Sequence, residues 1–375
     1  MEIIVREVVT KSDLNKFVKL PAKIHKGHQN WIPPIYMDEG DFFDPAKNKS
    51  FGYCDHIQLL AYRDNELVGR IMGLINHRYN KVKNENNARF SYLETFNDQE
   101  VAHALLSKVE SWASALGADK IVGPLGFSDK EPQGYLVDGF DEPTVLAANC
   151  NFKYQVDLIE NEGYVPEINL VTYKTAIPEK TPALYLRMLP RIEKLNSEFT
   201  MIEFESRWKL RKYIRPVLHL TNRAFQQIYG SMPYEEKEMD DFANRFIWLL
   251  NPKFVKVIED GQGKVIAYTV AMPDISKGIQ KCKGHLLPFG IFSILRSGKK
   301  SHRMVALLGA IEEEYRGRGL DVMMALKILE SGRKEGKTEI DGHLVMETNY
   351  AMRGEYEHIG GVVYKRYSIF AKSLK

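Results

Sequence analysis

The sequence predicts a mixed α/β fold built from two similar modules in tandem. Apolar runs of strand length alternate with segments of helical spacing along the chain, which is typical of an α/β protein. Two pairs of landmarks, Val68 with Ile266 and Gly163 with Gly361, are separated by the same number of positions. This shared spacing indicates an internal duplication. We therefore expect one domain over residues 1–180 and a second over residues 190–375.

Each element of the first half is expected from its periodicity and its end signals. In chain order these are a strand over Met1–Val9, a helix capped at Ser12–Asp13, a hairpin of His56–Tyr62 with Leu67–Ile75, a strand over Ala88–Phe96, a helix over Val101–Leu116, a short strand over Lys120–Val122 and a strand over Val165–Lys174. Three prolines between Pro178 and Pro190 predict a helix-poor boundary between the halves.

The second half repeats this order of elements. We expect a hairpin of Phe254–Glu259 with Val265–Met272, a strand over Met304–Ile311, a helix after Leu320, a strand near His343–Met346, a short helix over Asn349–Ile359 and a strand over Val362–Phe370. The halves differ in their insertions. The first carries residues 123–154 before its last helix, and the second carries an apolar segment before its central strand.

Composition narrows the function classes. The chain has 375 residues, 44% of them hydrophobic, which is enough for two cores. Lys and Arg number 52 against 49 Asp and Glu, so no basic surplus points to nucleic acid. The three cysteines show no CxxC spacing, which argues against a disulfide framework or a zinc site. The N-terminus does not resemble a signal peptide, and no apolar run reaches the roughly 20 residues of a membrane span. We expect a cytoplasmic protein without a transmembrane segment.

The most informative stretch is a strand, a glycine-rich turn and a helix within residues 303–329. The apolar run Met304–Ile311 is followed by acidic residues, and then by the sequence YRGRGL at 315–320. Glycines let the backbone approach a ligand closely, and a helix start directs unpaired N–H groups and its dipole at an anion. A pyrophosphate would fit there. The alternative is a basic turn that caps an ordinary helix.

This turn resembles the acyl-CoA-binding loop of the GNAT superfamily of acyl-CoA N-acyltransferases. Arg316 and Gly319 match the loop pattern, whereas Asp321 stands where Gly or Ala is expected. The resemblance implies two tandem domains, each a mixed, mostly antiparallel sheet flanked by helices, and acyl-CoA as the donor substrate without a metal. It assigns the cofactor contacts to Leu308, Ala310, Ile311, Arg316, Gly317, Arg318, Gly319, Leu320 and Asn349.

The resemblance also suggests catalytic residues. In GNAT proteins a tyrosine on the last short helix often protonates the leaving thiolate, and here that position matches Tyr356. A packed aromatic residue with an exposed hydroxyl is the alternative role. Glu347 is our candidate general base, since it precedes the same helix. His302 and His343 are further candidates, whereas residues 312–314 read more simply as a solvated acidic turn.

The first half lacks an equivalent glycine loop. Where the second half has its Arg-Gly turn, the first has FNDQEV at residues 96–101, with two acids and no glycine. Such a loop would repel a pyrophosphate. We therefore predict a degenerate first copy with a structural role or a role in shaping the substrate cleft.

An apolar insertion, residues 285–296, precedes the central strand of the second half and is followed by a basic run. It could pack between the domains, cover a hydrophobic substrate or touch a membrane surface. The function we expect is transfer of an acetyl or longer acyl group from acyl-CoA to a small-molecule amine. The alternatives are a non-catalytic module that binds a CoA thioester, which Asp321 favours, and an acyltransferase for a lipid-like amine, which the insertion favours.

Overall fold

The computed structural model describes residues 2–146, 148–248 and 250–375, so the predicted first strand is described from its second residue. The elements of the first half are β1 (Ile3–Glu7), α1 (Lys11–Ile24), α2 (Tyr36–Phe42), η1 (Lys49–Tyr53), β2 (Cys54–Arg63), β3 (Glu66–Asn76), α3 (His77–Lys83), β4 (Asn87–Thr95), α4 (Gln99–Ala115), β5 (Lys120–Gly123), β6 (Tyr135–Asp138), α5 (Lys153–Asn161) and β7 (Val165–Ala176).

The second half follows the same order with additional helices. Its elements are α6 (Ala183–Leu195), β8 (Thr200–Glu203), α7 (Arg207–Arg211), α8 (Ile214–Ala224), α9 (Glu236–Phe246), η2 (Pro252–Phe254), β9 (Val255–Glu259), β10 (Val265–Pro273), α10 (Ser276–Lys281), α11 (Gly290–Lys300), β11 (Arg303–Ile311), η3 (Glu313–Tyr315), α12 (Leu320–Lys334), β12 (Glu339–Gly342), β13 (Val345–Met346), α13 (Tyr350–His358) and β14 (Val362–Ser373).

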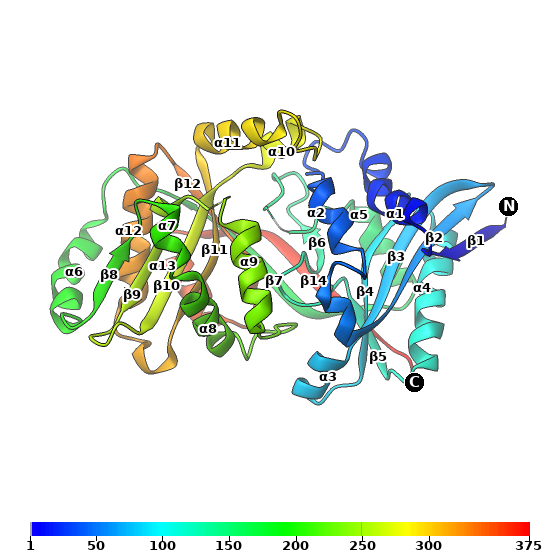
Figure 1. Ribbon diagram of the computed structural model, residues 1–375, viewed down its shortest axis with the longest axis horizontal. Coiled ribbons are helices and arrows are strands. Elements are labelled where there is room, and N and C mark those ends of the chain that lie inside the picture. Colours follow the sequence, from blue (N-terminus) through cyan, green and yellow to red (C-terminus); the bar gives the residue numbers. More distant parts are fainter. Residues whose placement is uncertain (1, 147, 249) are drawn as a thin grey trace.

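A single mixed sheet runs through both halves. Its main strand order is β1-β2-β3-β4-β5-β14-β7-β12-β11-β10-β9-β8, and most neighbours are antiparallel (Figure 1). In each half the exception is one parallel pair, β4 with β5 and β11 with β12. The predicted mixed α/β fold with a mostly antiparallel sheet flanked by helices is therefore confirmed.

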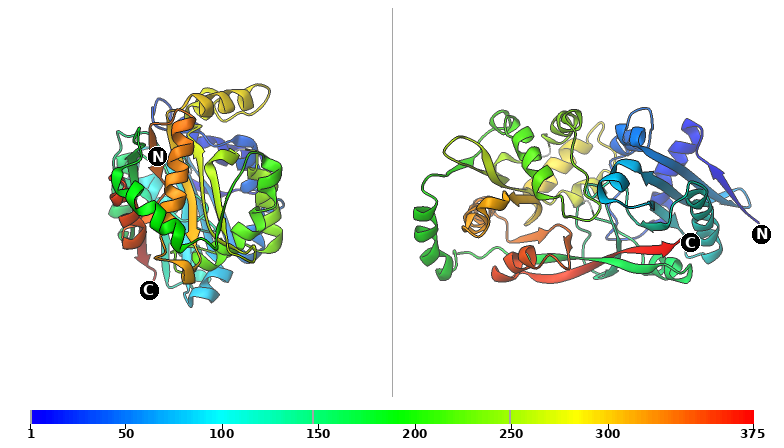
Figure 2. Two further views of the ribbon diagram at one scale, coloured as in Figure 1. Left: turned by 90° about the vertical axis from the view of Figure 1, so that its left-hand side faces the viewer. Right: turned by 90° about the horizontal axis from the view of Figure 1, so that it is seen from below.

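The two last strands of the halves are exchanged. β7, which ends the first half, pairs with β12 of the second half, whereas the C-terminal β14 pairs with β5 of the first. β7 and β14 also pair with each other along most of their length, and they run side by side across the molecule (Figure 2). Sequence periodicity identified both strands but assigned each to its own half. Each half of the sheet is thus completed by the other.

Alternation along the strands places a layer of side chains on each face of the sheet. In the second half, Ile258 and Ala267 pack with Leu320 and Met324 of α12. The neighbouring positions Val257 and Tyr268 instead pack with residues of α8 on the opposite face. In the first half, α4 covers β2, β3 and β4 in the same way with Val101, Leu105 and Val109.

Several predicted boundaries require correction. The helix predicted after Ser12 is present, but Thr10 is its N-cap and forms a capping box with Asp13. The stretch predicted to be helix-poor contains α6, which accommodates Pro190. The second-half strand expected near 343–346 is present only as the two-residue β13, and the strand that pairs with β11 is β12, which ends at Gly342. None of the described helices has the length and apolar character needed to cross a membrane.

Candidate functional site

The central strand of the second half separates from its parallel neighbour. β11 pairs with β12 over Arg303–Ala306, and no described strand lies along that edge of β11 from Leu307 onwards. A register shift against β10 at the same point leaves Leu307 without an opposite residue, so β11 carries a β-bulge there. Leu308, Ala310 and Ile311, which we assigned to the acyl-CoA arm, lie after this bulge. Their strand edge offers unpaired backbone polar groups to a ligand.

The glycine-rich turn leads directly into α12. Gly317 and Gly319 adopt φ values of 75° and 83°, a region that glycine enters without strain. Gly319 is the N-cap of α12 and has no side chain with which to cap it. Within the described part of the chain, the backbone N–H groups from Gly317 to Val322 have no hydrogen-bond acceptor. These donors and the positive end of the helix dipole form an anion cradle.

The turn is supported from behind by α6 and the residues that follow it. Asn196 donates a hydrogen bond to the carbonyl oxygen of Arg318 at 3.0 Å, and the Arg318 guanidinium pairs with Glu198 at 2.7 Å. A Cβ atom on Gly319 would lie 3.0 Å from Ile192, so the turn also packs tightly. The side chain of Arg318 is therefore engaged by the protein. Arg316 is exposed and donates from Nε to the carbonyl oxygen of Ile311.

Two carboxylates lie beside this cradle. Asp321 occupies the first turn of α12. The pKa of Glu355 is raised to about 7, mainly by desolvation and to a smaller extent by the negative charge of Asp321. Glu355 is nevertheless exposed to solvent. Protein atoms therefore surround the carboxyl group while water still reaches it. Glu355 is consequently close to half protonated at neutral pH.

Helix α13 brings Tyr356 to the end of β12. The Tyr356 ring stacks on Tyr173 with centroids 5.0 Å apart, and a Cβ on Gly342 would lie 2.9 Å from its hydroxyl oxygen. Glycine at 342 thus makes room for the hydroxyl group. Desolvation raises the pKa of Tyr356, so its hydroxyl keeps its proton at neutral pH. Asn349, which we assigned to the cofactor contacts, is the N-cap of α13 and accepts a hydrogen bond from the backbone N–H of Met352.

His343 follows Gly342 directly, at the end of the strand against which Tyr356 packs. Desolvation lowers the pKa of His343 to about 4, which makes the imidazole neutral at physiological pH. Its ring has no hydrogen-bond partner within the described ranges. By contrast, the Glu347 carboxylate forms an ion pair with Arg366 at 2.8 Å. The sequence named both residues as candidate bases but gave no physical reason to prefer His343.

The acidic residues after β11 do not behave as one solvated turn. Glu313 and Glu314 are exposed, as expected, but the side chain of Glu312 is 13% exposed. Glu312 accepts three hydrogen bonds from Arg223 of α8, and this interaction lowers its pKa. Glu312 thus joins α8 to the end of β11. The expectation of a solvated turn was wrong for this residue because its distant partner is invisible in the local sequence.

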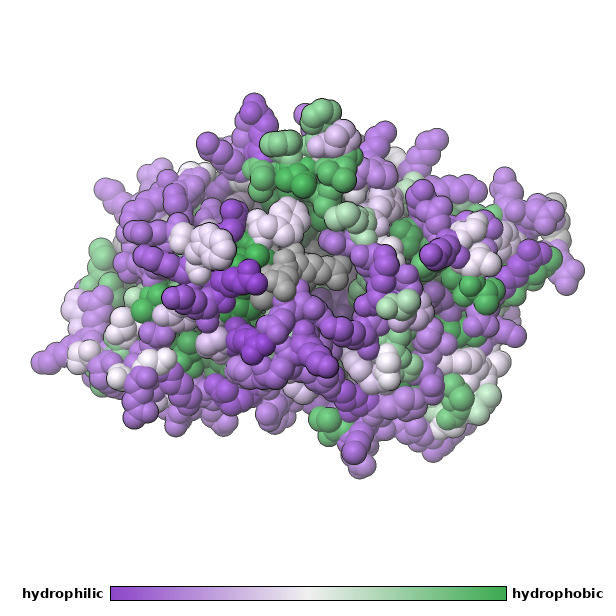
Figure 3. All heavy atoms as spheres, in the orientation of Figure 1, coloured by the Kyte–Doolittle hydropathy of each residue, from purple (hydrophilic) through white to green (hydrophobic). Residues whose placement is uncertain are grey.

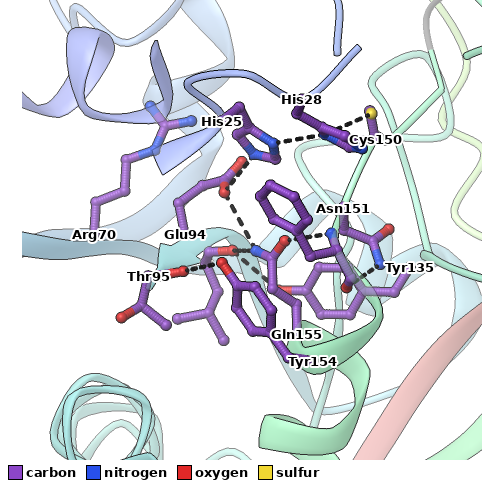
Figure 4. A network of polar contacts seen from close by, with 12 residues as sticks. His25, His28, Arg70, Glu94, Thr95, Tyr135, Cys150, Asn151, Tyr154 and Gln155 are labelled. Atoms are coloured by element: carbon purple, nitrogen blue, oxygen red, sulfur yellow. Dashed lines mark hydrogen bonds and ion pairs between the residues drawn. The ribbon is translucent and has the colours of Figure 1, made fainter. Parts of the chain in front are cut away.

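The corresponding cleft of the first half is filled by the chain itself. β4 pairs with β5 over Asn87–Arg89 and has an irregular register against β3 in its second half, as in the second-half site. There the side chains of Tyr135, Gln155 and Tyr154 donate hydrogen bonds to the backbone carbonyls of the strand (Figure 4). A buried ion pair between His25 and Glu94, 3.0 Å long, closes the same region.

The first-half loop also differs at its helix start. Asp98 is the N-cap of α4, and its side chain accepts a hydrogen bond from the backbone N–H of Val101. Arg63 pairs with both Asp98 and Glu100. Of the two acids that we expected to repel a phosphate, Asp98 therefore caps its own helix, and both form ion pairs with Arg63. An anion would have to displace these contacts.

The chain is similar to known proteins over nearly its whole length. No family model matches the chain. It is 25% identical to Protein YghO of Escherichia coli (strain K12) over 379 residues, which cover 99% of this chain and 95% of that protein. It is 27% identical to a bacterial ceramide synthase of Caulobacter vibrioides (strain NA1000 / CB15N) over 376 residues, which cover 98% and 96%.

Solved structures show the same architecture along the whole chain. A tandem GNAT protein from the clavulanic acid biosynthesis pathway matches with a TM-score of 0.57 at 12% identity, covering 100% of this chain and 99% of that one. The chain has the tandem GNAT fold. A GCN5-related N-acetyltransferase from Sphaerobacter thermophilus matches the same tandem GNAT fold with a TM-score of 0.55 at 12% identity, covering 100% and 96%. The fold predicted from the glycine-rich turn is thus confirmed.

Proposed function

We propose that the protein is an acyl-CoA-dependent N-acyltransferase whose cofactor site lies in the second half. The observation that carries this proposal is the row of unpaired N–H groups from Gly317 to Val322, next to a strand that separates from its neighbour. Together they match the two polar parts of an acyl-CoA, since a pyrophosphate accepts hydrogen bonds and the pantetheine amides pair with a strand edge. Arg316 supplies an exposed positive charge beside the cradle.

The residues around Gly342 have protonation states that suit amide formation. Bound acyl-CoA would supply a thioester carbonyl to the acceptor amine. The neutral imidazole of His343 would take a proton from that amine, directly or through water, and the Tyr356 hydroxyl would give a proton to the departing thiolate. We propose His343 in place of Glu347 as the base because Arg366 holds the Glu347 carboxylate.

Calorimetric titration with CoA tests the cofactor site. Arg316→Ala should weaken CoA binding about tenfold, because a charge-assisted hydrogen bond contributes about 1.5–3 kcal/mol in favourable geometry. Lys334→Ala removes an exposed charge from the opposite end of the same helix and serves as the control. Gly319 is a poorer site for substitution, since its positive φ and its contact with Ile192 would strain any side chain. Equal affinity in both variants would exclude this loop as the site.

A long-chain amine is the acceptor class that one specific observation favours. The relative named a bacterial ceramide synthase is matched over nearly its whole length, and a ceramide is an N-acylated long-chain amino alcohol. Turnover assays with matched short-chain and long-chain amines test this choice. A preference for the long-chain amine supports it, whereas faster acylation of a short polar amine contradicts it.

The rival function is a non-catalytic module that binds a CoA thioester. Asp321, which stands where the GNAT loop pattern expects Gly or Ala, favours this alternative. Single-turnover assays distinguish it from an enzyme. A module that binds acyl-CoA without catalysing acyl transfer would leave the thioester intact for every amine supplied.

A further inference from the structure

Four large apolar side chains are exposed on the segment 276–300, which contains α10 and α11 and which we name the α10–α11 tip. Leu287, Phe289, Phe292 and Leu295 expose 73%, 75%, 70% and 46% of their surface. They gather on the edge of the molecule where α10 and α11 lie, and they form an apolar area there (Figure 3). Single exposed apolar residues are common, but a cluster of this kind marks an interaction surface.

The opposite face of the tip is firmly packed. Leu286 and Ile294 are buried with Met272, Ile275 and Ile279 in one cluster, which also takes in Ile32 and Ile35 of the first half. Gln280 donates hydrogen bonds to the carbonyl oxygens of Gln29 and Trp31. The expectation that this insertion packs between the halves is therefore confirmed for its inner face. The exposed apolar face belongs to a rigid element.

The charged residues within the tip itself have one sign. No acidic residue occurs from Ile275 to Ile311, whereas the same stretch contains Lys277, Lys281, Lys283, Arg296, Lys299, Lys300 and Arg303. The four lysines and the arginine nearest the exposed apolar residues, Lys281, Lys283, Arg296, Lys299 and Lys300, are all exposed. Exposed phenylalanine and leucine side chains next to lysines and arginines are typical of a helix that lies in a membrane interface, where anionic headgroups attract the cations.

We propose that the α10–α11 tip docks on the surface of a lipid bilayer that contains anionic lipids. The apolar side chains enter the interface between headgroups and acyl chains, while the lysines and Arg296 contact the phosphates. The tip stands off from the body of the protein, so a flat surface can reach it (Figure 2). Leu307, at the bulge of β11, packs against the inner face of the same cluster. Docking at the tip therefore places the membrane on the side of the molecule that adjoins the separated strands.

Vesicle cosedimentation tests the proposal without any turnover assay, so its outcome is separate from that of the proposed enzyme activity. The full chain should bind phosphatidylcholine vesicles that contain phosphatidylglycerol, and binding should weaken as salt is raised. Vesicles of pure phosphatidylcholine should bind the protein at least about tenfold more weakly than the vesicles that contain phosphatidylglycerol. Binding to neither vesicle, or equal binding to both, would overturn the proposal.

Two variants locate the binding surface. The triple variant Leu287→Ser/Phe289→Ser/Phe292→Ser and the double variant Lys299→Gln/Lys300→Gln should each lose about tenfold or more in affinity for anionic vesicles. These side chains are exposed, so the fold should be retained. The control is Leu184→Ser/Leu186→Ser/Leu195→Ser, which removes three apolar residues of α6 that are more than half exposed.

The control variant should bind anionic vesicles as the unaltered protein does. Loss of binding in the control with retention in the tip variants would move the surface to α6 and overturn the proposal. Sedimentation velocity provides a second readout. If the unaltered protein self-associates and the triple serine variant is monomeric, the occupant of the tip is a second copy of the chain and the membrane proposal is wrong.

Discussion

Tyr356 and His343 are the proposed acid and base of the candidate site. Both side chains lie where β12 ends, and desolvation acts on them in opposite directions. It raises the pKa of the phenol and lowers that of the imidazole to about 4. At neutral pH the phenol therefore holds a proton and the imidazole lacks one, which are the states required of an acid and a base.

Tyr356→Phe should lower kcat by about 10²-fold, because general acid catalysis typically contributes that much or more. The affinity for CoA should be unchanged, since the ring stacking on Tyr173 is retained. Steady-state kinetics and a CoA titration measure the two quantities. Tyr173→Phe, which keeps the stack and removes a different hydroxyl, is the matched control. Equal turnover in Tyr356→Phe and the unaltered protein would remove Tyr356 from the mechanism.

Glu355 should make CoA binding depend on pH. Its pKa is raised to about 7, so the carboxyl group is neutral below that pH and negatively charged above it. Because Glu355 interacts with Asp321 at the start of α12, its ionisation adds negative charge beside the proposed pyrophosphate position. We expect CoA affinity to fall as pH rises from 6 to 8.

Glu355→Gln provides the comparison, because the phosphate groups of CoA ionise in the same way in the experiments with the two proteins. The variant should lose the part of the pH dependence that belongs to the protein, and calorimetry at both pH values measures it. If the two proteins show the same change in affinity, Glu355 does not lie near the bound phosphates.

At the scale of elements, the turn before α12 and the turn before α4 show what sequence can predict. YRGRGL and FNDQEV differ in glycine content and charge, and in the structure the start of α4 is capped by Asp98 whereas the start of α12 has no side-chain cap. The engagement of Arg318 by Glu198 and of Glu312 by Arg223 could not be predicted, since each partner lies far away in the sequence. The filling of the first-half cleft was hidden for the same reason, because Tyr135 and Tyr154 belong to a later insertion.

At the scale of the whole molecule, the repeat of elements was visible in the sequence, but the exchange of β7 and β14 was not. Periodicity identifies a strand and its buried face, whereas strand partners depend on contacts far along the chain. The exchange also gives the first half a structural role in this architecture. It supplies β7 to the sheet that carries the candidate site, next to β12.

The exchange predicts that the two halves depend on each other for folding. A fragment of residues 1–180 lacks β14, which would leave the edge of β5 unpaired, and a fragment of residues 181–375 lacks β7. Each fragment alone should be unfolded or aggregated by circular dichroism and sedimentation, whereas coexpression should give a soluble complex. Two fragments that are each folded and monomeric would contradict the exchanged pairing.

Hydrogen–deuterium exchange with and without CoA tests the central claim most directly, because it reports where the ligand binds in the intact chain. We predict slower exchange at residues 307–323, which include the unpaired amides from Gly317 to Val322 and the edge of β11 that no longer pairs with β12. Residues 90–101 of the first half should be unchanged. Protection of residues 90–101, or no protection at 307–323 at saturating CoA, would contradict the assignment of the acyl-CoA site to the second half.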